Sequence, residues 1–187
     1  MRPPCLATRV DARESWSPEL ELGLRDRRLD LALSHSIAPA DGLSAVTLRR
    51  ETLVAVVGAR HPLAGRSAVR LRDLRGETFC FLGRALAPDF HDLVVSALRK
   101  AGEDFEIWEH PVPGLRVSPL RDDGSGFTLV CKSAGTRLGS GLVALPLLDR
   151  LPAVEVRIVW RTSDVPPPAQ TVLQAAYELA RGQSWGN

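Results

Sequence analysis

Residues 51–64 read ETLVAVVGARHPLA, and this stretch decides the fold class. Its first part, LVAVV at 53–57, is a continuous apolar run of the length expected for a strand that is covered on both faces. The part that follows, 58–65, is polar and rich in glycine and proline, which is typical of a connection between two elements. The stretch therefore predicts a buried strand that ends in a tight turn.

Strands and helices are predicted to alternate on both sides of this stretch. A helix is expected after Ser17, which is a typical N-cap residue with Pro18 at the first helical position. Apolar periodicity predicts two further helices, at 88–101 and after the prolines at 166–168. Strands are expected at 6–10, 29–33, 43–48, 53–57, 78–82, 105–109, 127–131, 142–145 and 154–160. The alternation predicts an α/β architecture with a largely parallel sheet.

The composition is that of an ordinary globular protein. The 187 residues are 44% hydrophobic and 25% charged, with a formal net charge of +2. No apolar run approaches the roughly 20 residues of a membrane-spanning helix, and the first residues lack the apolar stretch of a secretory signal. Cys5, Cys80 and Cys131 are widely spaced and form no CxxC pair, which argues against a disulfide framework and a zinc ribbon. We therefore expect a cytoplasmic protein that does not contact the membrane.

The charges are balanced along the chain. Arginines cluster at 25–28 and 49–50, and acidic residues flank both clusters. A protein that binds nucleic acid by itself usually carries a continuous basic stripe. The clusters are therefore interpreted as solvated faces, and the chain is not expected to bind DNA by itself.

Several segments, taken in order, resemble one family. They are SPEL at 17–20, LDLAL at 29–33, ETLVAVV and HPLA within 51–64, LRDLRG at 71–76, GSGFTLV at 124–130 and VRIVWR at 156–161. In this order and spacing they resemble the effector-binding domain of LysR-type transcriptional regulators. The resemblance implies the type II periplasmic-binding-protein fold, in which two α/β lobes are joined by two crossover strands and a ligand cleft lies between the lobes.

The resemblance also implies a division of the chain. Lobe I would comprise residues 1–58 and 154–187, lobe II residues 59–153, and the crossover strands would lie near 54–57 and 154–158. The match begins at the family's second strand and includes no DNA-binding domain. The first strand and first helix of lobe I are therefore expected to be missing, which predicts a fragment of a longer reading frame or a degenerate copy.

Four candidate effector-binding residues follow the ends of predicted strands, where sheets of this class bind ligands, and two more, which could form the wall of lobe II, open the strand predicted at 127–131. A small carboxylate needs donors at strand ends and helix N-termini. Arg84 could pair with such an anion or be an exposed loop arginine, and Phe127 could form a cleft wall or belong to the core. The predicted set is Ser34, His35, Gly83, Arg84, Phe127 and Thr128.

The sequence offers little for catalysis or metal binding. Cys131 precedes Lys132, but no histidine lies on an adjoining strand end, so Cys131 is predicted to be a buried apolar residue. The four histidines at 35, 61, 91 and 110 share no metal-ligand spacing. His91 lies away from the apolar stripe of its helix and is predicted to face solvent. We therefore expect no enzymatic activity, no metal and no cofactor.

The function that the resemblance implies is effector sensing in transcription regulation. A small metabolite, plausibly a carboxylate, would bind between the lobes, and closure would bias an attached DNA-binding domain. The family forms homodimers, and DNA would be contacted only through the domain that this chain lacks. Three alternatives stay open: an enzyme on the same fold, a solute-binding protein, and a truncated remnant without function.

Overall fold

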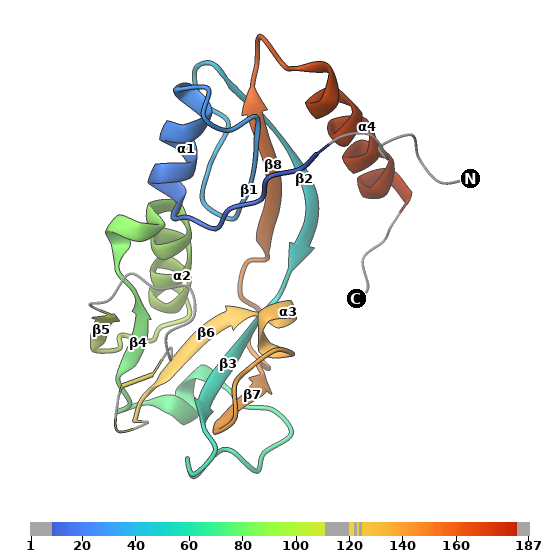
Figure 1. The fold of residues 1–187 in the computed structure, drawn as a ribbon. Helices are drawn as coiled ribbons and strands as arrows, with labels where there is room; N and C mark the ends of the chain where they lie inside the picture. The colour runs from blue at the N-terminus through green and yellow to red at the C-terminus, as the bar shows by residue number, and fades with distance from the viewer. Residues whose placement is uncertain (1–8, 111–119, 122, 124, 183–187) are drawn as a thin grey trace. The chain divides into compact units, whose positions relative to one another are not determined.

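The computed structural model of the protein describes residues 9–110, 120, 121, 123 and 125–182 (Figure 1). Contacts divide the chain into two units: unit 1 is Met1–Arg50 with Glu155–Asn187, and unit 2 is Glu51–Val154. The chain thus passes from unit 1 into unit 2 after Arg50 and returns after Val154. The predicted division assigns residues 51–58 to lobe I, whereas their contacts group them with unit 2 because the strand at 53–58 is paired on both sides there.

Unit 1 contains a three-stranded sheet with a helix on each face. Its elements are α1 (Ser17–Arg25), β1 (Leu31–Ser34), β2 (Leu43–Glu51), β8 (Val154–Arg161) and α4 (Pro167–Gly182). The strand order is β1-β8-β2, and β1 runs antiparallel to β8. Val159 packs with Leu24 of α1, whereas its neighbour Ile158 packs with Leu173 of α4. Because successive side chains of a strand point to opposite faces, α1 and α4 cover opposite faces of this sheet.

The start of α1 differs by one residue from the prediction. Trp16 has the extended backbone of an N-cap residue, and Ser17 is already the first helical residue. At the other end, Arg161 of β8 fixes the C-terminal turn, because its Nη1 donates to the carbonyl oxygens of Leu24 and Leu29 at 2.9 and 2.6 Å. The Arg161 guanidinium thus ties the end of α1 and the turn after it to β8.

Unit 2 contains a five-stranded mixed sheet. Its elements are β3 (Leu53–Gly58), β4 (Phe79–Leu82), α2 (Pro88–Lys100), β5 (Ile107–His110), β6 (Phe127–Cys131), α3 (Lys132–Gly135) and β7 (Leu142–Pro146), with 3₁₀ turns at Leu71–Leu74 and Arg84–Leu86. The strand order is β5-β4-β6-β3-β7. β4 is parallel to β5 and β6, whereas β3 is antiparallel to β6 and β7.

The prediction of a largely parallel sheet is therefore wrong. In unit 2 the pairs on either side of β3 are antiparallel, and in unit 1 so are β1 and β8. Burial explains the error: all residues of the apolar run at 53–57 are buried, as predicted, but burial on both faces does not set the direction of a neighbouring strand. The strand predicted at 6–10 lies mostly outside the described residues, and Arg9 and Val10 are not in a strand.

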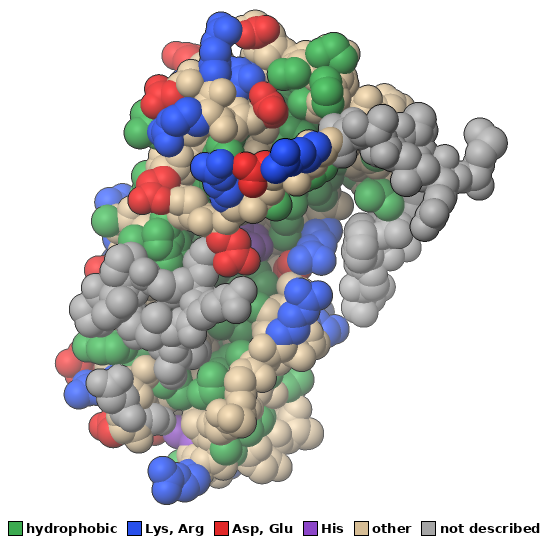
Figure 2. Space-filling model, viewed as in Figure 1, with side chains coloured by type: hydrophobic (Ala, Val, Ile, Leu, Met, Phe, Trp, Pro, Cys, Tyr) green, Lys and Arg blue, Asp and Glu red, His purple; other side chains and the backbone are tan. Residues whose placement is uncertain are grey.

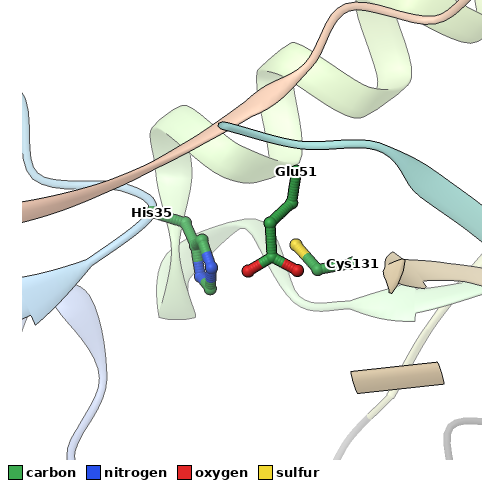
Figure 3. Close-up of side chains that lie close together, drawn as sticks. All are labelled: His35, Glu51 and Cys131. Carbon is green, nitrogen blue, oxygen red and sulfur yellow. The ribbon is translucent and has the colours of Figure 1, made fainter. Parts of the chain in front are cut away.

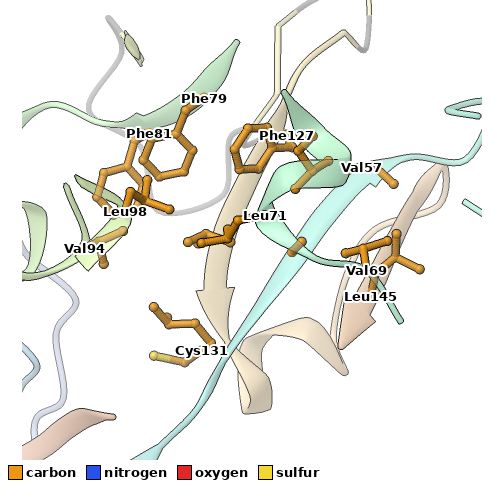
Figure 4. Close-up of a cluster of buried hydrophobic side chains, with 14 of the residues drawn as sticks. Val57, Val69, Leu71, Phe79, Phe81, Val94, Leu98, Phe127, Cys131 and Leu145 are labelled. Atoms are coloured by element: carbon orange, nitrogen blue, oxygen red, sulfur yellow. The ribbon is translucent and has the colours of Figure 1, made fainter. Parts of the chain in front are cut away.

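The core of unit 2 is built around aromatic rings (Figure 4). Phe127 of β6 is fully buried, with its ring centroid 5.2 Å from that of Phe79 and 4.9 Å from that of Phe105. Phe79 in turn stacks on Phe81 of the same strand at 4.8 Å. Apolar side chains of β3, α2 and the first 3₁₀ turn close this core.

Basic and acidic side chains intermingle on the described surface. Figure 2 shows Lys and Arg side chains interspersed with Asp and Glu on the face drawn. In the cluster at 25–28, Arg25 pairs with Glu21, Arg27 with Asp164, and Arg28 with Asp26. The basic residues of this cluster are thus exposed and paired with acids, as expected for a solvated face. Among the described residues, no helix combines the length and apolar character needed to cross a membrane.

Candidate functional site

The predicted site residues of unit 1 lie where β1 ends. Ser34 is its last residue and is buried, with 7% of its surface exposed, whereas His35 is exposed. The Ser34 hydroxyl oxygen accepts a hydrogen bond from the backbone N–H of Ser36 at 3.0 Å. It also lies 3.2 Å from the hydroxyl of Ser17, in the first turn of α1. β1 and α1 thus bring two serine hydroxyls together at the N-terminus of a helix.

The electrostatics of this end of α1 favour negative charge. The first N–H groups of a helix have no partner within the helix, and the helix dipole adds a partial positive charge. The side chain of Trp16, the N-cap residue, forms no capping hydrogen bond. The acid of the first turn, Glu19, accepts a hydrogen bond from the Ser15 hydroxyl. The hydroxyls of Ser17 and Ser34 are therefore suited to hydrogen-bonding an oxygen-rich anion.

In unit 2, Gly83 and Arg84 begin the 3₁₀ turn that follows β4, and Arg84 is held by an acid. Its Nε donates to Asp92 Oδ1 at 2.8 Å and its Nη2 donates to Asp92 Oδ2 at 2.7 Å. This bidentate pair joins the turn to α2 and occupies two of the guanidinium's N–H groups. The structure therefore assigns Arg84 an intramolecular partner; its predicted role in anion binding stays a prediction.

The prediction that His91 faces solvent is wrong. His91 is 7% exposed, and its ring centroid lies 5.7 Å from that of Phe81. Its Nδ1 is 3.2 Å from Asp92 Oδ1, and its Nε2 is 3.4 Å from Glu109 Oε1 of β5. Helical periodicity identified the face of α2 that meets the main core, but β4 and β5 also cover the side that carries His91. The burial of this side of α2 depends on tertiary packing, which helical periodicity does not describe.

We expect Asp92 to remain charged to very low pH. The pKa of its carboxyl is lowered to about 2 because Arg84, and then His91, hydrogen-bond to the ionised form. Since this pKa is lower in the folded than in the unfolded chain, the stabilisation is complete above about pH 4 and is lost as the pH falls through 2. Replacing Arg84 with glutamine should move the pKa of Asp92 toward 3.8, as measured by NMR titration of the carboxyl carbon. In the matched control Arg66→Gln, whose arginine contacts Asp73, the titration of Asp92 should not change.

Phe127 and Thr128 are both buried in β6, with 0% and 3% exposed. The Phe127 ring contacts Phe79 and Phe105, so it belongs to the core of unit 2. Thr128 lies opposite Val56 in the antiparallel pairing with β3. Of the two interpretations of Phe127, the core position is the one for which contacts are observed; a role for either residue in ligand binding stays a prediction.

A buried carboxylate that sequence reasoning missed lies at the start of unit 2. Glu51 is 8% exposed, and its Oε2 accepts a hydrogen bond from the backbone N–H of Ser133 at 3.0 Å. Cys131, buried as predicted, precedes α3 and lies beside this carboxylate (Figure 3). Thus Glu51 anchors the first turn of α3 to the segment that leads into β3. The only signal in the sequence is an acid directly before an apolar strand, which is too common to identify the contact.

Comparison with known proteins places this architecture in a family. The family model described as the LysR substrate binding domain matches residues 6–181. The regulator named "HTH-type transcriptional regulator BudR" of Raoultella terrigena is 28% identical over 141 residues, which are 74% of this chain and 48% of that protein. The chain spans about half the length of the curated relatives it matches.

Solved structures share the fold at low sequence identity. The effector-binding domain of QuiR in complex with shikimate has a TM-score of 0.76 at 15% identity, covering 90% of this chain and 80% of that chain. The BenM effector-binding domain with benzoate has a TM-score of 0.73 at 22% identity, covering 94% and 80%. These likenesses confirm the predicted fold class. Because the family model matches nearly its whole length, the chain belongs to the family of LysR substrate-binding domains.

Proposed function

We propose that this chain is the effector-sensing domain of a transcriptional regulator and that its effector is a small organic acid. Two solved relatives of the same fold are described with such molecules, QuiR with shikimate and BenM with benzoate. The observation on this chain that carries the proposal is the pair of hydroxyls of Ser17 and Ser34, 3.2 Å apart at the N-terminus of α1. An organic acid supplies the acceptor oxygens and negative charge that such a group of donors favours.

The hydrogen-bonding of Ser34 fixes what it can offer a ligand. Its oxygen already accepts the N–H of Ser36, so the hydroxyl hydrogen is available to an acceptor on another group. Without a ligand, the Ser17 oxygen is one such acceptor. A ligand carboxylate or hydroxyl can take its place, which leaves the Ser17 hydroxyl free to donate as well. The pair then acts as two donors toward one anion.

The regulatory context extends the same proposal to a longer protein. BudR is named as a helix-turn-helix regulator, and this chain covers 48% of its length. DNA would be contacted by a separate helix-turn-helix domain. Effector binding here would shift the equilibrium between two conformations of the regulator. We further propose a cytoplasmic homodimer without enzymatic activity, in keeping with the balanced charge of the chain and the regulator names of its relatives.

Ligand-dependent unfolding tests the proposal. Thermal unfolding is measured with a panel of small organic acids that includes benzoate and shikimate. A ligand at 100 times its Kd stabilises the folded state by about 2.7 kcal/mol, which gives a clear upward shift of Tm. Ser34→Ala should lower the affinity about tenfold for the acid that raises Tm, since a buried hydrogen bond to a charged group is lost. The proposal fails if no acid shifts Tm.

The matched control is Ser44→Ala, in the same unit. Ser44 also pairs its hydroxyl with another hydroxyl, that of Thr162, at 2.8 Å, but it lies on β2. This variant should bind the ligand as the unmodified protein does. Equal losses of affinity in the two serine variants would show a general effect on unit 1 and would overturn the assignment of Ser34.

A further inference from the structure

Unit 2 carries a surface groove along α2. Its volume is about 590 Å³, and one wall is the exposed face of α2 while the other is the segment between β7 and β8. The apolar part of the lining comprises Leu93, Ala97, Ala101, Leu151 and Pro152, and the polar part comprises Asp92, Ser96, Lys100 and Arg150. The volume lies within the range of pockets that hold small molecules, about 300–1,000 Å³.

The charges of the groove are separated along the helix. Lys100 and Arg150 are exposed, and neither forms an ion pair within the part of the chain that the structure describes. Arg99 adds a third cation in an adjoining hollow of about 410 Å³, which shares Asp92, Ser96 and Lys100 with the groove. Asp92, two turns before Lys100, already holds Arg84 in a bidentate pair. Lys100 and Arg150 therefore give the groove positive charge that no ion pair among the described residues compensates.

The helix dipole explains only part of this arrangement. Cations are favoured at a helix C-terminus, and this accounts for Arg99 and Lys100 in the last turn of α2. It does not account for Arg150, which comes from another segment, or for the partly buried apolar floor that includes Leu93 and Leu151. A partly accessible apolar floor beside uncompensated cations is the complement of a molecule with an apolar body and an anionic end.

The geometry points to a binding site for a small amphipathic anion, an organic carboxylate with an apolar chain or ring, in the groove between α2 and residues 150–152. Its carboxylate lies at the end that carries Lys100 and Arg150, where the Ser96 hydroxyl is a further donor. Its apolar body lies over Leu93, Ala97 and Leu151. This site lies wholly within unit 2 and does not depend on the function proposed for Ser34.

The scarcity of lysine makes a direct test possible. The chain contains two lysines, Lys100 in the groove and Lys132 at the start of α3. Reductive methylation with ¹³C-formaldehyde keeps their charge and gives each lysine its own NMR signal. The probe is octanoate, with 1-octanol as the uncharged control and octylammonium as the control of opposite charge. Octanoate should shift the Lys100 signal in a saturable manner and leave the Lys132 signal in place.

Calorimetric titration of octanoate into unmethylated variants measures the contribution of each cation. Lys100→Met and Arg150→Met should each weaken binding roughly three- to tenfold, and added NaCl should weaken binding further. Lys132→Met removes the same charge outside the groove and should bind octanoate with unchanged affinity. In Ser34→Ala the Lys100 signal should respond to octanoate as it does in the unmodified protein, which separates this site from the proposed effector site.

Several outcomes would overturn the inference. One is a parallel shift of both lysine signals, which indicates non-specific association. Another is 1-octanol binding as tightly as octanoate, because the cations would then contribute nothing. A third is unchanged octanoate affinity in both Lys100→Met and Arg150→Met. A Lys100 signal that moves with protein concentration in the absence of octanoate, and no longer responds to octanoate, would assign the groove to a second copy of the chain.

Discussion

Replacing Gly126 with alanine should destabilise unit 2 by about 3–5 kcal/mol. Gly126 precedes β6 with a φ of +82°, a conformation that costs an L-residue about 1 kcal/mol or more. A Cβ at this position would lie 2.5 Å from the carbonyl oxygen of Thr78 and 2.9 Å from Cys80 Sγ. Thr78 cannot withdraw freely, because its oxygen accepts the N–H of Phe127 at 3.0 Å and so joins β4 to β6. Overpacking against backbone adds roughly 2–3 kcal/mol.

The control for Gly126 is another glycine of the same unit. Gly76 has a φ of +87°, but nothing lies within 4 Å of the position that its Cβ would take. Gly76→Ala should therefore lose only about 1 kcal/mol, the cost of the backbone conformation. Urea unfolding followed by circular dichroism measures both variants. Equal losses in the two variants would show that the close approach at Gly126 has no energetic effect.

Truncation of Phe127 to alanine should destabilise unit 2 to a similar extent, by about 3–5 kcal/mol. The side chain is 0% exposed and contacts the rings of Phe79 and Phe105, so its removal loses the apolar transfer energy and leaves a cavity between two strands. Part of the loss comes from the aromatic pairs themselves, which contribute about 0.5–1.5 kcal/mol each. The same urea titration measures the change.

The control for Phe127 is Leu148, an apolar side chain that is 55% exposed. Leu148→Ala should change the free energy of unfolding by about 0.5 kcal/mol or less, as is usual for surface positions. The result also bears on the site, since a ring that lined an open cleft would be solvated on one side. A loss below about 1 kcal/mol for Phe127→Ala would contradict the core position and support the interpretation as a cleft wall.

The sequence predicts the elements of this fold better than their pairing. The apolar runs at 53–57 and 127–131 are strands within a residue of the expected bounds, since each run is bounded by strong turn signals. Strand direction was wrong around β3, because an antiparallel and a parallel neighbour bury the same apolar residues. His91 was misplaced for a related reason: helical periodicity describes one covered face, and the second cover comes from strands distant in the sequence.

The candidate site shows the same limit more strongly. That Ser34 follows a strand is visible in the sequence, but its contact with Ser17 across 17 residues is not. Likewise Arg84 was identified as a cation in a loop, whereas its bidentate partner Asp92 lies eight residues further on, across a turn. Local spacing therefore predicts which side chains lie near strand ends, and tertiary packing decides which of them already have partners. The expected absence of a first strand and helix stays a prediction.

The chain leaves unit 1 after Arg50 and returns to it after Val154, and this order has a consequence for folding during synthesis. Unit 2 is one continuous segment, so all of its strands have been synthesised before β8 is complete. Unit 1 is different, because β8 lies between β1 and β2 in its sheet. After residues 1–50, more than a hundred residues are synthesised before β8, the central strand of the sheet in unit 1. Since domains tend to fold as they emerge from the ribosome and distant pairings form slowly, unit 2 should fold first and unit 1 last.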